Sequence, residues 1–455
     1  MNFTVFLKDP LLYILIKYVV PVGPLPYVRE RPFLTLSGTF LHQTKGLVLK
    51  YYRIAVKTKS LKNNKTPYYS FIPIIFFKSL RRIGFAMAIF SILINQLPMA
   101  AKAADIIHTT IEPATDSVPR SDTASIAPLS DGQLMVVYHK YEKGNNDGHD
   151  HGICRIWSKI SSDGGFSWKK PRLLVDVAKG DMNVQAPGLL KTKSGKLLMI
   201  CLRAHKGGNS STMCLFSSDD DGVTFKELAP LWKVSNGQLL QGGTSSIMEL
   251  ESGRLIVPFH GGTGNQWSQK NSAWCLYSDD GGDSWRKSNA INLAKRGAME
   301  ASVSELKKNN LIMSLRTQLG GPYFARSVDG GKTWSKATFG GLEGGESGTC
   351  LRRLPGTKKL ILFWNNSRYE KNHHHFGERT PLTTAISSDT GKTWKIIGHV
   401  AKEPKAEYTN LDCFFTKDHA LLTYMLAKPA WNRKEIHLKV ALIPLEWFHS
   451  NPENN

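Results

Sequence analysis

Four residues in the second half of the sequence combine side-chain types that can do chemistry together: Glu300, Arg316, Arg379 and Tyr408. An arginine guanidinium binds a carboxylate through two parallel hydrogen bonds and does not lose its charge, so a pair of arginines suits an anionic ligand. A tyrosine with a pKa near 10 is only about 0.1 % ionised at pH 7, so it is a nucleophile only beside a base such as a glutamate. Whether these residues meet depends on the elements that carry them.

The most regular feature of the sequence is an octapeptide of the form S-x-D-x-G-x-[TS]-[WF]. It occurs five times, as SSDGGFSW (161–168), SDDDGVTF (218–225), SDDGGDSW (278–285), SVDGGKTW (327–334) and SSDTGKTW (387–394). The Asp accepts backbone N–H groups of a turn, the Gly supplies a positive φ, and the aromatic residue is placed to pack beneath the turn. Apolar runs flank the copies, so each octapeptide, called an Asp box below, is predicted to form the tip of a β-hairpin.

A second repeat accompanies the boxes. A turn followed by an apolar run occurs at 129–138, 192–201, 250–259, 306–315 and 354–364, and 422–427 is a candidate sixth copy. Runs that are apolar throughout indicate strands covered on both faces. The box aspartates are 57, 60, 49 and 60 residues apart. This spacing predicts an all-β fold, a six-bladed β-propeller over residues 104–455. One blade lacks a box, and a strand from 105–112 is expected to complete the last blade.

The box-and-strand pattern of residues 104–455 resembles the bacterial sialidases (neuraminidases) and their BNR-repeat relatives. In that family the boxes lie on the rim of a six-bladed propeller, which implies that here they fasten the blades. A sialic acid carries a carboxylate on its anomeric carbon, so an attacking carboxylate would meet repulsion of about 4 kcal/mol at an effective dielectric near 20. A Tyr nucleophile avoids this repulsion, and sialidases with a Tyr nucleophile are an exception among glycosidases.

The resemblance implies roles for the four residues. MEASVSELKKNNLIMSLRT (299–317) is similar to the sialidase segment that runs from the catalytic Glu to the second arginine. It implies that Glu300 is the base for Tyr408, the nucleophile, while Arg316 and Arg379 bind the substrate carboxylate. The alternatives are that Glu300 is a surface charge, that the arginines bind box carboxylates, and that Tyr408 belongs to the core.

The first half of the sequence fits the resemblance less closely. Arg120 takes the place of the first arginine, but the family's Arg-Ile-Pro is replaced by Arg-Ser-Asp. The general acid is expected on the loop 140–152, where Asp150 is preferred and Asp147 also qualifies. The departure leaves the preferred sugar open. The segments 180–190, with Arg203, and 237–246 are expected to present polar groups at the mouth of the site.

Together these features predict an exo-α-sialidase-like glycoside hydrolase with a retaining mechanism and no cofactor or metal. Its partners would be sialylated or other acidic glycans. Two alternatives stay open: a propeller hydrolase or lyase for another acidic sugar, and a glycan-binding propeller without turnover.

Residues 1–103 differ in composition from the rest, with 15 Lys/Arg and two acidic residues against 44 and 35 in residues 104–455. Residues 81–103 have the basic start, apolar centre and Ala-Lys-Ala end of a secretory signal peptide, which predicts a secreted or periplasmic protein. Residues 1–80 form a basic extension that is expected to be absent from the mature protein, and no stable membrane span is expected in the mature chain. The charge comes without a nucleic-acid-binding motif, so no nucleic-acid partner is expected. Six cysteines without C-x-x-C spacing would be either disulfides or buried thiols.

Overall fold

The computed structural model describes five strands within residues 2–76 and residues 105–449 except 145–148, 208–209, 235–237, 243–246 and 264–269. It divides the chain into two units, Met1–Ala101 and Lys102–Asn455. In the first unit β1 (Asn2–Val5) pairs with β2 (Ile16–Val19), and β3 (Leu34–Thr44), β4 (Leu47–Lys57) and β5 (Tyr69–Phe76) form a second sheet. The expected signal peptide, 81–103, lies outside the described residues.

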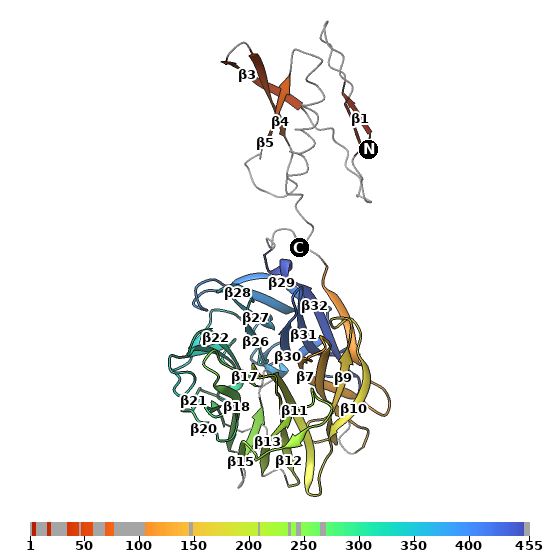
Figure 1. The fold of residues 1–455 in the computed structure, drawn as a ribbon, viewed down its shortest axis with the longest axis vertical. Helices are drawn as coiled ribbons and strands as arrows, with labels where there is room; N and C mark the ends of the chain where they lie inside the picture. The colour runs from red at the N-terminus through yellow and green to blue at the C-terminus, as the bar shows by residue number, and fades with distance from the viewer. Residues whose placement is uncertain are drawn as a thin grey trace. The chain divides into compact units, whose positions relative to one another are not determined.

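The second unit is all-β, and its described strands fall into six antiparallel sets that follow one another along the chain (Figure 1). The first three sets are β7 (Arg120–Pro128), β8 (Leu134–Tyr141), β9 (Cys154–Ser161) and β10 (Lys169–Val175); β11 (Asp181–Lys191), β12 (Leu197–His205), β13 (Ser211–Ser218), β14 (Lys226–Glu227) and β15 (Trp232–Val234); and β16 (Gln238–Gly242), β17 (Met248–Glu249), β18 (Leu255–Thr263), β19 (Lys270–Ser278), β20 (Arg286–Lys287) and β21 (Ile291–Asn292). The last three are β22 (Met299–Lys307), β23 (Asn310–Arg316), β24 (Tyr323–Ser327) and β25 (Thr338–Phe339); β26 (Cys350–Arg353), β27 (Leu360–Asn365), β28 (Leu382–Ser387) and β29 (Lys395–Ala401); and β30 (Glu407–Phe415), β31 (His419–Ala427) and β32 (Ile436–Pro444) with β6 (Ile107–Glu112).

The sixth set takes its fourth strand from the other end of the unit. β6 pairs antiparallel with β32, with Ile107 opposite Leu442, so the expected contribution of 105–112 is confirmed (Figure 1). A single parallel bridge between Ile436 and Arg120 joins this set to the first set. Because β32 and β6 are far apart in sequence, no hairpin connects them, and this explains why the sixth set has no Asp box.

In the third set, β16 and β17 both pair with β18 and are counted together as its first strand. The five boxes are then hydrogen-bonded turns between the third and fourth strands of the first five sets. In the fourth set, Oδ1 of Asp329 accepts the N–H of Thr333 at 3.0 Å and the hydroxyl of Ser327 at 2.7 Å, and its Oδ2 accepts the Thr333 hydroxyl at 2.6 Å. The same bonds surround the aspartates of the other boxes, Asp163, Asp220, Asp280 and Asp389. The prediction of rigid hairpin tips is therefore confirmed.

A glycine of each box also packs closely against a side chain of the neighbouring set. Gly331 has a φ of +83°, and a Cβ there would lie 2.4 Å from Cδ1 of Ile256 in the third set, so only glycine fits. The box of the first set packs in the same way against the sixth set, because a Cβ on Gly165 would lie 3.0 Å from Cδ1 of Leu421. The boxes therefore fasten adjacent sets, as the sequence analysis expected.

The repeated apolar runs of the sequence form the second strands of the sets, and nearly all their residues are buried. All six cysteines are buried free thiols, which is the second of the two expected states. Cys201 lies opposite Cys214 in the pairing of β12 with β13.

In the described part of the unit the helical segments are the short 3-10 turns η2 (His374–Phe376) and η3 (Leu445–His449), and neither approaches the length that spans a bilayer.

The first strands of four sets carry a β-bulge at which one residue adopts a left-handed backbone. These residues are Thr123 in β7, Ala186 in β11, Glu300 in β22 and Asn410 in β30, with φ values of 39°, 51°, 38° and 57°. A bulge bends the strand and changes the direction of the side chains beside it, and bulges are frequent next to functional sites. The predicted site residues lie on or beside these first strands.

Candidate functional site

Arg316, at the end of β23, lies between two carboxylates. Its Nη1 donates to Oε1 of Glu300 at 2.5 Å, and its Nη2 lies 3.3 Å from Oε1 of Glu346. Glu346 also binds Nη1 of Arg296 at 2.8 Å and is only 2 % exposed. A buried guanidinium is stable only when paired, so these carboxylates hold Arg316 in place. Neither arginine predicted in this half of the chain binds an Asp-box carboxylate in the described contacts.

Arg379 precedes β28 and is joined to Arg316 through Glu346. Its Nη1 donates to Oε1 of Glu407 at 2.7 Å, and its Nη2 donates to the backbone carbonyl of Glu346 at 3.3 Å. The guanidinium lies 5.1 Å from the ring centre of Trp431, and the backbone N–H of Trp431 donates to Oε2 of Glu407 at 3.1 Å. Two of the predicted arginines therefore belong to one buried network.

Arg120, the first residue of β7, has two acidic partners. Its Nε donates to Oδ2 of Asp122 at 2.7 Å, and its Nη1 donates to Oδ1 of Asp150 at 2.7 Å. Asn410 of β30 also donates to Oδ2 of Asp122, at 2.9 Å. Since β30 carries Glu407 as well, this strand connects the surroundings of Arg120 with those of Arg379. The name "arginine cluster" denotes below Arg120, Arg316 and Arg379 with their partners Asp122, Asp150, Glu300, Glu346 and Glu407.

Two buried histidines support the bulges beside the cluster. The N–H of Glu300 donates to Nδ1 of His260 at 3.2 Å, and the N–H of Ala186 donates to Nδ1 of His139 at 3.2 Å. Each histidine lies on the second strand of the preceding set and accepts an N–H at a bulge. His139 then carries its proton on Nε2, which faces Asp122. Burial lowers the pKa of both histidines to about 4, so both are neutral at pH 7.

Two opposing effects determine the pKa values in the cluster: burial disfavours the charged form of each group, and nearby charges of opposite sign favour it. Burial acts to raise the pKa of Glu346, but Arg316, His375 and Arg296 outweigh it, and the pKa lies well below its usual range. Burial likewise opposes the charge of Arg316, yet Glu300 and Glu346 raise the pKa of this guanidinium. Burial is the main cause of a lowered pKa for Arg379, to which the charge of Arg316 adds. Arg316 and Glu346 therefore form an ionised pair at neutral pH.

Asp150 differs from the other carboxylates because its side chain is 55 % exposed. Desolvation by the protein atoms around it acts to raise its pKa even at this exposure, but the charge and hydrogen bond of Arg120 lower the pKa well below the usual range. Nδ2 of Asn183, a fully buried residue of β11, donates to the carbonyls of Asp150 at 2.7 Å and of Gly152 at 3.3 Å. The alternative acid, Asp147, lies outside the described residues.

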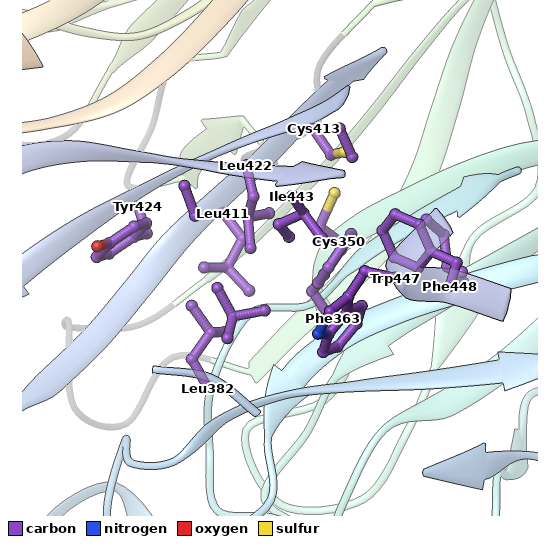
Figure 2. Close-up of a cluster of buried hydrophobic side chains, with 14 of the residues drawn as sticks. Cys350, Phe363, Leu382, Leu411, Cys413, Leu422, Tyr424, Ile443, Trp447 and Phe448 are labelled. Carbon is purple, nitrogen blue, oxygen red and sulfur yellow. The ribbon is translucent and has the colours of Figure 1, made fainter. Parts of the chain in front are cut away.

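Tyr408 does not join the cluster. It is 1 % exposed and belongs to a core formed with Phe363, Leu382 and Tyr424, residues that Figure 2 labels. Its hydroxyl accepts the backbone N–H of Glu403 at 3.2 Å, and burial raises its pKa. Consecutive residues of a strand point to opposite faces, so Tyr408 turns away from the face on which Glu407 binds Arg379. The structure thus favours the alternative of a core tyrosine and does not bring Tyr408 to Glu300.

The residues expected at the mouth have local partners. Arg203 binds Asp181 at 2.8 Å and the carbonyl of Asp176 at 3.1 Å. Residues 237 and 243–246 of the second expected segment lie outside the described residues. In the tract His373–His375, the ring of His375 stacks on Trp431, with centroids 5.1 Å apart, and its Nδ1 lies 3.2 Å from Oε2 of Glu346.

Sequence reasoning missed Glu346, Glu407 and Asp122, which hold the three arginines. Glu346 lies in the glycine-rich segment 340–348, which carries no motif. A usable signal existed for the other two, since each is one or two residues from a predicted site residue, and a buried arginine requires a nearby carboxylate.

Besides Oδ1 of Asp122, which faces Nε2 of His139, three polar atoms of the cluster are buried without a hydrogen-bond partner among the described residues: Oε2 of Glu300, Nε of Arg316 and Nε of Arg379. A buried unpaired polar group costs about 1–3 kcal/mol, and more when charged. Such atoms favour binding of a ligand that supplies the missing partners. Chemically, the arrangement offers guanidinium groups for an anion, and Glu300 and Asp150 as carboxylates that can move protons.

Comparison with known proteins gives consistent similarities. A model of the BNR repeat-like domain matches residues 132–417. A sialidase of Bacteroides fragilis is 26 % identical over 302 residues, which cover 58 % of this chain and 52 % of that protein. An anhydrosialidase of Macrobdella decora is 27 % identical over 246 residues, covering 49 % of this chain and 30 % of that protein. The chain thus spans about half or less of the length of these curated relatives.

The fold is also shared with solved structures. The intramolecular trans-sialidase of Ruminococcus gnavus, solved in complex with oseltamivir carboxylate, has a TM-score of 0.59 and 16 % identity. The match covers 76 % of this chain and 99 % of that one. At this identity the similarity concerns the fold.

Proposed function

The chain belongs to the family of BNR repeat-like domains, and from this premise we propose that it is a sialidase-like glycoside hydrolase that acts on a terminal acidic sugar. The observation that carries the proposal is the arginine cluster, in which three arginine residues, each at most 9 % exposed, are held by five carboxylates. Rigid, permanently charged groups of this kind suit the carboxylate of a sialic or related keto-acid sugar.

The proposed architecture is a six-bladed β-propeller in which the six strand sets are the blades. The contact of Gly165 with Leu421 and the pairing of β6 with β32 support closure between the first and sixth sets. β30 also contacts β7, so the first strands of these sets are neighbours. In this arrangement the first strands, which carry the bulges together with Arg120 and Glu300, face one common centre.

We assign Arg120, Arg316 and Arg379 to the substrate carboxylate, Asp150 to proton transfer with the leaving oxygen, and Glu300 to the base. The unpaired Oε2 of Glu300 supports its role as a proton acceptor. A retaining mechanism with Tyr408 as nucleophile stays a prediction, and the core position of that side chain does not support it. The mechanism invokes no cofactor.

One observation favours a second candidate function. Because Tyr408 lies in the core, the arginine cluster would also suit a propeller that binds acidic glycans without turnover.

The domain boundaries also stay proposals: a basic extension (1–80), a signal peptide (81–103) that implies a secreted or periplasmic protein, and the propeller (104–455).

Hydrolysis of a fluorogenic α-sialoside by the full chain, beside a fluorogenic β-glucuronide, tests the proposal. Turnover of the sialoside alone is the expected result. Turnover of the glucuronide alone would replace sialic acid with a uronate as substrate. Binding of the sialoside without release of the fluorophore would establish the second candidate instead.

A further inference from the structure

The carboxylate of Asp150 lies where the carboxylate of a ligand would bind Arg120. The distance of 2.7 Å between its Oδ1 and Nη1 of Arg120 is that of a charge-assisted hydrogen bond. The buried partners of the arginines, Asp122, Glu346 and Glu407, have side chains at most 2 % exposed, whereas that of Asp150 is 55 % exposed. Moving Asp150 into water therefore costs far less than moving any of those three.

The backbone at Asp150 stays anchored when its side chain moves. Asn183 holds the carbonyls of Asp150 and Gly152, and the N–H of Gly152 donates to the carbonyl of His149 at 2.8 Å. Rotation about the side-chain bonds of Asp150 is then enough to take its carboxylate away from Arg120. The second partner of Arg120, the buried Asp122, keeps the guanidinium in position during that rotation.

We propose that Asp150 is an exchangeable internal ligand of Arg120, which the carboxylate of the acidic sugar displaces on binding. The inference rests on the proposed function and extends it, because the displaced residue is the same one that is assigned to proton transfer. The exchange breaks one ion pair and forms another, so the charge around Arg120 is unchanged. A neutral sugar cannot complete the exchange, so the step selects for an anionic substrate.

The exchange also changes the acidity of Asp150. In contact with Arg120 its pKa is held well below the usual range, and an ionised carboxylate cannot donate a proton. Away from Arg120 the pKa rises, so the carboxylate can take up a proton from the bulk solvent (hydronium or buffer acid) and deliver it to the leaving oxygen. Binding of the substrate and preparation of the acid would thus be one event.

Asp150→Asn tests the exchange because loss of the carboxylate should raise the affinity for the acidic sugar while it lowers turnover. The amide keeps the size of the side chain but competes poorly for Arg120, so we expect N-acetylneuraminic acid to bind about tenfold more tightly in calorimetry. Turnover of a fluorogenic α-sialoside should fall at least about 100-fold, because the acid is lost. Asp176→Asn is the matched control, since Asp176 is 57 % exposed and also pairs with an arginine, Arg155, at 2.6 Å.

Unchanged affinity in Asp150→Asn, with normal binding by the wild type, would overturn the exchange and leave the proposed function standing. Equal tightening in Asp176→Asn would also overturn it, because the effect would then be a general consequence of the lost charge. Absence of both binding and hydrolysis in the wild type would overturn the proposed function itself. Asp150→Ser, which also removes the charge, repeats the test with a smaller side chain if the amide variant melts at a lower temperature.

Discussion

Glu407 and Tyr408 are consecutive residues of β30 whose side chains serve opposite faces of the strand. The carboxylate of Glu407 binds Arg379 at 2.7 Å, whereas the hydroxyl of Tyr408 accepts the N–H of Glu403 at 3.2 Å within the core. A shift of one residue in the strand would exchange the two. The direction of the Tyr408 side chain therefore decides whether this residue is the predicted nucleophile or a structural residue of the core.

Tyr408→Phe should change turnover of a fluorogenic α-sialoside by no more than about twofold. The ring keeps its packing, and the lost hydrogen bond to Glu403 should lower the free energy of unfolding by about 1 kcal/mol. Steady-state kinetics and denaturant titration measure the two effects. A loss of several orders of magnitude in kcat with unchanged stability would show that Tyr408 reaches the substrate in another conformation and would restore the Tyr/Glu mechanism.

Glu300→Gln should reduce kcat at least about 100-fold, the size expected for loss of a proton-transferring group. The amide keeps the shape of the side chain but removes the base and the ion pair with Arg316. Glu305→Gln is the control, because Glu305 lies on the same strand and accepts the N–H groups of Glu251 and Asn309. Similar kcat values for the two variants would argue against a chemical role for Glu300.

Stability should fall as the pH decreases from 7.5 to 5. Burial lowers the pKa of His139 and His260 to about 4 in the folded state, so the unfolded chain, with a histidine pKa near 6.5, binds more protons in this range. Each histidine should then cost about 2 kcal/mol of stability at pH 5.

His260→Asn checks the origin of this pH dependence, because the amide oxygen can accept the N–H of Glu300 without titrating. Denaturant unfolding at the two pH values should show a smaller loss for this variant than for the wild type. His149→Asn, at an exposed position, should leave the loss unchanged. An unchanged loss in His260→Asn would mean that other groups cause it.

Asp329→Ala should lower stability by about 1–3 kcal/mol, because three side-chain hydrogen bonds of the box are removed. The kinetic constants of the folded protein should stay within about twofold, since the box fastens neighbouring sets and does not touch the arginine cluster. Val328→Ala, at a position 78 % exposed in the same box, should alter neither. Lost turnover at an unchanged melting temperature would place the box in the site.

Much of the fold could be predicted because its signals are local. The box residues Ser327, Asp329, Gly331 and Thr333 bond to one another within seven positions, so the pattern alone defines the turn. The repeated apolar runs likewise identified the second strand of each set from the sequence alone. The order of the sets and the missing sixth box then followed from spacing.

The site was less predictable because its contacts are long-range. Glu346 meets Arg316 and Arg296 from a loop without a motif, 30 and 50 residues away. The direction of Tyr408 depends on the register of β30 and its bulge at Asn410, which no local pattern reveals. Residue types singled out Arg316 and Arg379, which the structure places in one network through Glu346, but the carboxylates that hold them come from the tertiary structure.

The central claim is that the arginine cluster recognises the carboxylate of an acidic sugar during its hydrolysis. The most direct measurement compares kcat/KM of the full chain for a fluorogenic α-sialoside and for its methyl ester, which differ only in that charge. The account predicts hydrolysis of the free acid and a value at least about 100-fold lower for the ester, about 3 kcal/mol of transition-state stabilisation. Equal values for the two substrates, or hydrolysis of neither, would contradict it.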